Sequence, residues 1–294
     1  MKKIAVLADS GCQIEITGDH PGIYIAPLCI TMKQKTYLDQ LEVTSIDVFK
    51  TMEKENLIVQ TSQPSTGEMI KAVEKIKEDG YEEVIGIPIA TGLSSTLNGM
   101  KIACDMVGLP VTLIDSKGTA RNQRELVYKA RELVEAGKDV SYIKDVLEDM
   151  VEHSGTVIMV PNLDHLKKGG RITPAVALLA GMLKIVPVME LNYKLGGKID
   201  TLTKVRTIKK AAKTLIDRAI EKGAEASTYA FAIEHVLCEK EAEELKEYLI
   251  HKVGSCDVIV RELPAVVGAH MGVGGIGVQY IKVKKGLTRI DNLD

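Results

Sequence analysis

The stretch EVIGIPIATGLSSTLNGMKIACDMV, residues 83–107, places an apolar run, a polar loop and a helical segment in direct succession. The apolar run at 83–89 is typical of a buried strand in a parallel sheet, and 96–107 has the length of a helix. The alternation extends on both sides, with expected strands at 3–8 and 110–114 and expected helices at 43–55, 65–78 and 121–135. Strands that alternate with helices at this spacing predict βαβ units and a parallel sheet.

The second half of the sequence has a different pattern. Expected strands lie at 156–160, 185–191, 198–204, 228–234, 257–261 and 277–283, and expected helices at 174–183, 207–221 and 239–253. The strands at 185–191 and 198–204 are joined by Gly196-Gly197, which indicates a tight turn. Long meandering strands with interspersed helices are typical of an α+β domain. We therefore predict an N-terminal α/β domain at 1–154 and a C-terminal α+β domain at 155–294.

Composition and charge narrow the function classes. The formal net charge of −2 argues against nucleic-acid binding, which needs a surplus of Lys and Arg. The first apolar run is ended by Asp9 too early for a signal peptide, and the apolar stretch 174–191 is interrupted by Lys184, Pro187 and Glu190. We therefore expect a cytoplasmic protein without a membrane span.

The cysteines and other metal-binding side chains give no sign of a metal site. No Cys-x-x-Cys spacing occurs, and no His, Cys or carboxylate cluster has the spacing of a metal site. We expect free, buried thiols in a reducing compartment at all five cysteines. These are Cys12, Cys29, Cys104, Cys238 and Cys256.

Polar patches follow the expected strands of the first half. They are Asp9-Ser10, Thr61-Ser62, 91–95 and Asp115-Ser116. Ligands bind at the carboxyl ends of parallel strands, which is where all four patches are expected. Ser65 and Ser95 can each simply cap a helix, which is the plainer interpretation. Hydroxyls at Thr61 and Ser94 just before those helix starts favour an anion such as a carboxylate or phosphate.

Two further residues fit an anion site. His270 lies inside the glycine-rich run 268–277, where the backbone can approach a ligand closely. Arg171 follows Gly169-Gly170, and its planar fork matches a carboxylate. Considered alone, Arg171 is more typical of a surface residue than of a binding site. His270 alone fits a turn as well as it fits a binding site. Together with the hydroxyl patches they form a set suited to gripping a carboxylate.

These motifs, in this order and spacing, resemble the DegV family. The motifs that carry the resemblance are the first strand with Asp9-Ser10, Thr61-Ser62-Gln63-Pro64-Ser65, the Ser94-Ser95 loop, Asp115-Ser116, Leu163-x-x-Leu166-x-x-Gly169-Gly170-Arg171-Ile172, Leu183-x-Ile185-x-Pro187-Val188, Lys204-Val205-Arg206-Thr207 and Gly268-Ala269-His270-x-Gly272. The resemblance implies a two-domain protein with a long-chain fatty acid, such as palmitate, buried between the domains. It also implies the carrier subunit of a bacterial fatty acid kinase system, in which the kinase phosphorylates the acyl carboxylate.

The resemblance assigns the carboxylate to Thr61 and Ser94, with Ser62, His270 and Arg171 in the surrounding network. Including the adjacent Ser95, the predicted site is Thr61, Ser62, Ser94, Ser95, Arg171 and His270. We expect no catalytic residue, no cofactor and no metal. The expected partners are the fatty acid, a kinase subunit and, transiently, a membrane surface.

Two alternatives stay open at the level of sequence. Ser94 or Thr61 with His270 as base would suit an acyl hydrolase or transferase, although no Gly-x-Ser-x-Gly elbow is present. The same helix starts would suit a regulator that binds phosphate or a phosphosugar.

Overall fold

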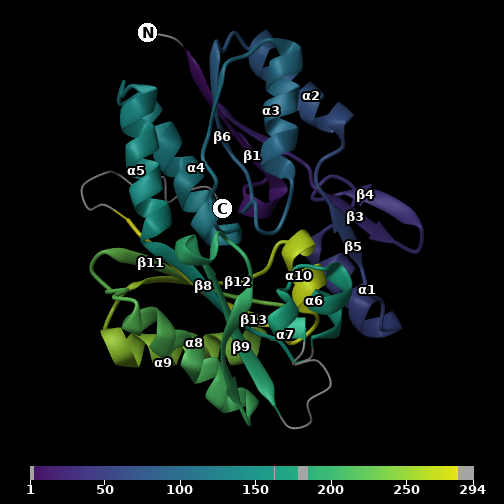
Figure 1. Ribbon diagram of the computed structural model, residues 1–294, viewed down its shortest axis with the longest axis vertical. Coiled ribbons are helices and arrows are strands. Elements are labelled where there is room, and N and C mark those ends of the chain that lie inside the picture. Colours follow the sequence, from purple (N-terminus) through teal and green to yellow (C-terminus); the bar gives the residue numbers. More distant parts are fainter. Residues whose placement is uncertain (1–2, 162, 178–184, 284–294) are drawn as a thin grey trace.

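The computed structural model describes residues 3–161, 163–177 and 185–283, which form two main sheets with helices around them (Figure 1). The first sheet has the order β2-β1-β6-β7, and all its neighbouring strands are parallel. Its strands are β1 Ile4–Asp9, β2 Ile23–Ala26, β6 Glu83–Ile87 and β7 Val111–Leu113. The predicted parallel βαβ unit is therefore confirmed.

Helices cover both faces of this first sheet. They are α2 Thr66–Glu78, α3 Thr96–Val107, α4 Ala120–Glu135 and α5 Val140–Glu152. The apolar sides of α2 and α3 pack on one face and that of α4 packs on the other, while α5 packs against α4 and against the second sheet. Burial on both faces explains why the strands read as continuous apolar runs.

The second sheet has the order β10-β9-β8-β13-β11-β12 and is mixed. Its strands are β8 Ser154–Met159, β9 Val186–Asn192, β10 Asp200–Val205, β11 Tyr229–His235, β12 Asp257–Glu262 and β13 Ile276–Lys282. Only β11 and β12 pair in parallel. Helices α8 Ile208–Glu221 and α9 Glu239–Val253 cover one face. The expected α+β architecture of the second half is confirmed.

A third, three-stranded sheet with the order β4-β3-β5 was not predicted. It is antiparallel and consists of β3 Cys29–Met32, β4 Lys35–Leu38 and β5 Gln60–Ser62. The hairpin between β3 and β4 turns at Lys33 and Gln34, which both have a positive φ. Such turns usually carry Asn-Gly or a glycine, and because neither is present the sequence gives no sign of the hairpin. The expectation that Thr61-Ser62 ends a strand of the parallel sheet was wrong, because both residues belong to β5.

Several smaller expectations need correction. Helix α1 Ser45–Glu55 begins two residues after the expected start at 43, because Thr44 caps it, with the Asp47 amide donating to the Thr44 hydroxyl. Ser95 occupies the cap position of α3 but makes no side-chain cap hydrogen bond. Of the helix expected at 174–183, α7 Pro174–Ala177 is present, and 178–183 lies outside the described residues. None of the helices in the described ranges combines the length and apolar character needed to cross a bilayer.

A buried polar network connects the end of β1 to the three-stranded sheet. The Ser10 hydroxyl donates to the Asp39 carboxylate at 2.6 Å and accepts from the Leu28 amide at 3.1 Å. The Asp39 amide donates to the Leu28 carbonyl at 2.9 Å. Burial raises the pKa of Asp39 from 3.8 to about 7, while the Ser10 hydrogen bond lowers it in part. The network fixes the chain segment that leads into β3.

Asp39→Asn should flatten the pH dependence of stability. The native Asp39 pKa lies above its unfolded value, so between about pH 4 and pH 7 the native carboxyl keeps a proton that the unfolded chain releases. The free energy of unfolding therefore falls as pH rises through this window, by up to about 4 kcal/mol. Asn still accepts from Ser10 but cannot ionise.

Urea unfolding from pH 4 to pH 8 measures this difference, with the exposed Asp19→Asn as a control for the loss of one negative charge. Parallel stability curves for the wild type and Asp39→Asn would contradict the buried-carboxyl account.

Candidate functional site

A cavity lies between the two main sheets. Its empty space is about 780 Å³, which includes the part that is open to solvent at its mouth. Its wall is mainly aliphatic and comes from both halves of the chain. The aliphatic lining residues are Leu28, Ile89, Leu93, Ile158, Leu166, Leu191, Ile199, Leu263, Val266 and Val267. Such a wall suits an apolar ligand.

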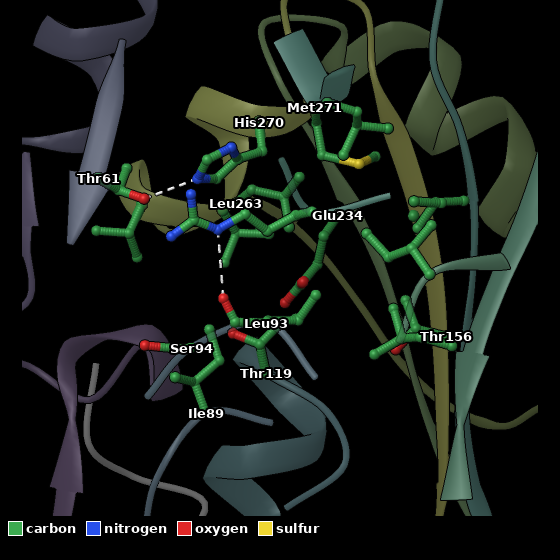
Figure 2. Close-up of a pocket in the computed structure, with 18 of the residues that line it drawn as sticks. Thr61, Ile89, Leu93, Ser94, Thr119, Thr156, Glu234, Leu263, His270 and Met271 are labelled. Carbon is green, nitrogen blue, oxygen red and sulfur yellow. Dashed lines mark hydrogen bonds between the residues drawn. The ribbon is translucent and has the colours of Figure 1, made fainter. Parts of the chain in front are cut away.

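Thr61 of β5 and His270 lie at one end of the cavity and are joined there by a hydrogen bond (Figure 2). The Thr61 Oγ1 and His270 Nε2 atoms are 2.7 Å apart. His270 lies in the last turn of α10 Ala265–Met271, a helix that was expected as a glycine-rich loop. This helix packs against α1 and against β3 and β5, which explains how residues so distant in sequence meet.

The imidazole of His270 is almost fully enclosed. It is 9% exposed, and its Nδ1 has no hydrogen-bond partner among the described residues. Burial, and to a smaller extent the charge of the nearby Arg171 guanidinium, lowers the pKa of His270 from 6.5 to about 4. The ring is therefore neutral at pH 7. A Cβ atom at Gly169 would lie 2.1 Å from Nδ1, so the ring fits only because Gly169 has no side chain.

Arg171 reaches the same end of the cavity from the turn after α6 Asp164–Gly169. Gly170 closes this helix with a φ of 72°, a left-handed conformation that glycine adopts without strain. The Arg171 Nε donates to the Leu93 carbonyl at 3.3 Å, and its Nη1 donates to the Gly169 carbonyl. These bonds hold a permanent positive charge beside the neutral imidazole.

The serine patches divide into lining and non-lining residues. Ser94 lines the cavity, and its hydroxyl is 2.8 Å from the Thr96 hydroxyl. Ser62 also lines the cavity and is exposed. Ser95 is exposed and is not among the lining residues. The structure thus brings together five of the six predicted residues, namely Thr61, Ser62, Ser94, Arg171 and His270, and leaves Ser95 just outside.

Sequence reasoning missed a second group of polar lining residues. They are Thr119, Thr156, Glu234 and Gln279. Glu234 carried a signal that could have been used, because it is a charged residue inside the apolar strand Tyr229–His235. The other three are neutral residues that β8, β13 and the loop before α4 turn inward, which local sequence does not reveal.

In the parts of the chain that the structure describes, no group of three or more His, Cys, Asp or Glu side chains is arranged to hold a metal ion. The five cysteines are free thiols. Cys12, Cys29 and Cys104 are buried as expected, whereas Cys238 and Cys256 are only half-buried.

We expect His270 to titrate near pH 4 in the wild type, and Gly169→Ala to change this. The added methyl group must displace the imidazole, break the bond to Thr61 and let water reach the ring, so the pKa should return toward 6.5. ¹⁵N-detected NMR titration of the histidine rings measures both values. Gly67→Ala is the matched control, because the nearest atom to its added methyl is 4.0 Å away. An unchanged His270 titration in Gly169→Ala would contradict this packing argument.

Comparison with known proteins agrees with the family resemblance that the sequence motifs indicate. The family described as "Uncharacterised protein, DegV family" matches residues 3–283. A DegV domain-containing protein of Staphylococcus aureus is 34% identical over 293 residues, covering 97% of this chain and 100% of the relative.

Two solved structures share the fold over nearly their full length. A fatty acid binding DegV family protein from Streptococcus agalactiae matches with a TM-score of 0.87 and 28% identity, covering 97% of this chain and 100% of that chain. DegV of Bacillus subtilis, described as a fatty acid binding protein, matches with a TM-score of 0.82 and 28% identity, covering 96% and 100%. The expected family and fold are thus confirmed, and the chain belongs to the DegV family.

Proposed function

We propose that this protein binds a long-chain fatty acid, with its acyl chain in the cavity and its carboxylate at the end formed by Thr61, Ser94, Arg171 and His270. The observation that carries the proposal is an aliphatic cavity between two sheets with hydroxyls, an imidazole and a guanidinium at one end. The fatty acid binding described for two relatives at 28% identity supports it.

The aliphatic wall accounts for affinity. Burying an acyl chain contributes about 0.8 kcal/mol per CH₂, so about a dozen methylenes give on the order of 10 kcal/mol before entropy costs. A buried carboxylate must be hydrogen-bonded or paired, or its burial cancels that gain. Arg171 supplies the positive charge, and the hydroxyls of Thr61 and Ser94 supply donors. The polar end therefore fixes orientation, while the tail dominates the affinity.

The proposed role is non-catalytic, in preference to the hydrolase alternative. Thr61 and His270 are close enough to be a nucleophile and its base. However, His270 Nδ1 lacks a partner among the described residues, so the third group that orients the base in a catalytic triad is missing there. Ser94 hydrogen-bonds with Thr96 rather than with His270.

The phosphate-binding alternative also fits less well. A phosphate or phosphosugar needs a polar, solvated wall, whereas this cavity is lined mainly by aliphatic side chains. Ser95 at the start of α3 lies outside it.

A fatty acid kinase is the proposed partner, in the cytoplasm, with palmitate as a representative ligand. The family resemblance supports this role. The exposure of Ser62 beside the half-buried Thr61 and Ser94 also supports it, because it brings the polar end close to the surface. A carboxylate held there would be within reach of a partner that transfers a phosphoryl group to it.

The double variant Thr61→Ala with Ser94→Ala should weaken palmitate binding by about tenfold to a hundredfold, since two hydroxyl donors are removed. Ser95→Ala is the matched control: it deletes a neighbouring hydroxyl that does not line the cavity, and should leave affinity unchanged. Titration calorimetry with delipidated protein measures both. Equal palmitate affinity in the double variant and the wild type would rule out the carboxylate assignment.

A further inference from the structure

Glu234 is a fully buried carboxyl group in the wall of the fatty-acid cavity. It lies in β11, and its register partner in β13 is Gly277, which also lines the cavity. Figure 2 shows its carboxyl group directed toward the interior of the pocket. A Cβ atom at Gly277 would contact only methyl groups of Ile158 at 3.4 Å and Thr156 at 3.9 Å. A methyl group at Gly277 would therefore fit the cavity wall with ordinary van der Waals contacts.

Neither carboxyl oxygen of Glu234 has a hydrogen-bond partner among the described residues. Burial raises the pKa of Glu234 to about 7, while the charges of Arg124 and Arg261 and the backbone amide and charge of Arg121 lower it in part, although none of these groups has hydrogen-bond geometry with the carboxyl group. The other buried carboxyls, Asp9 and Asp39, are both hydrogen-bonded. Glu234 is thus an exception to the rule that buried polar groups are paired.

The polar neighbour of Glu234 on the same sheet face cannot satisfy it. Gln279 lies two residues from Gly277 along β13 and is already fully engaged. Its Oε1 accepts from the Asn122 amide at 3.3 Å, and its Nε2 donates to the Thr119 carbonyl and to the Thr156 hydroxyl. Gln279 is therefore not free to pair with Glu234, and a group that fills the cavity can supply the missing hydrogen bond.

We propose that Glu234 binds a hydroxyl group carried on the acyl chain, so that the preferred ligand is a hydroxylated long-chain fatty acid. This inference rests on the proposed function and narrows its ligand class. An unsubstituted chain would cover the carboxyl group with methylenes and leave it unpaired, whereas a hydroxyl both donates and accepts. A site built to pair with a hydroxyl discriminates against the analogue that lacks it.

The test is a binding series on delipidated protein, using octadecanoic acids hydroxylated at successive chain positions and unsubstituted stearate. We expect one narrow range of positions to bind about tenfold more tightly than stearate, equivalent to about 1.4 kcal/mol. Affinity equal to or below that of stearate at every position would overturn the inference, with a resident water pairing Glu234, and would leave fatty acid binding intact. If neither stearate nor any hydroxylated acid binds, the proposed function fails as well.

Variants assign the preference to the carboxyl group itself. Glu234→Gln keeps a donor and an acceptor and should retain the preference, whereas Glu234→Leu should abolish it by improving stearate binding relative to the hydroxylated acid. Should Glu234→Leu fail to fold beside Arg124, Gly277→Ala adds a methyl group to the cavity wall at the register partner of Glu234 without altering charge, and should also abolish it. A preference that persists in Glu234→Leu, or in Gly277→Ala where that variant replaces it, would overturn the assignment.

Discussion

The hydrogen bond between Thr61 and His270 is the contact on which the site depends, because it joins residues 209 positions apart. Thr61 belongs to the small antiparallel sheet, and His270 belongs to the helix α10 that follows β12. Their contact closes one end of the space between the two main sheets. It is possible only because Gly169 leaves room for the imidazole, which burial and the charge of Arg171 keep neutral. Because the His270 imidazole is neutral, the positive charge at this end of the cavity is that of the Arg171 guanidinium, which matches the charge of one anionic group.

The buried carboxyl groups of the scaffold differ from the one in the cavity wall in their hydrogen bonding. Asp9 accepts from the amides of Gly11 and Ile89 and from Gln123, and Asp39 accepts from Ser10, so both are paired within the protein. Such pairing holds β1 and the three-stranded sheet in place. His270 Nδ1 and the carboxyl group of Glu234 are instead unpaired among the described residues, and both residues line the cavity. A ligand in the cavity can supply the partners that these two groups lack.

Predictions from the sequence were correct where neighbouring residues decide the local structure. Apolar runs such as 83–87 identified the parallel sheet, and Ser65 was correctly expected to cap α2. They failed where tertiary packing decides, since the hairpin at Lys33 and Gln34 lacks a turn signature and α10 grows from a glycine-rich segment that favours a loop. Five of the six candidate site residues line one cavity, although Thr61 and Ser62 reach it from a sheet that was not expected. Glu234 was missed although a charged residue inside an apolar strand is a signal, and the fold adds that the strand turns it toward a cavity.

The most direct test of fatty acid binding is native mass spectrometry of the protein as purified from cells, followed by analysis of its organic extract. The account predicts one long-chain fatty acid per protein chain, released on denaturation and identified by its mass. A bare protein that also stays bare after incubation with palmitate and oleate would contradict it.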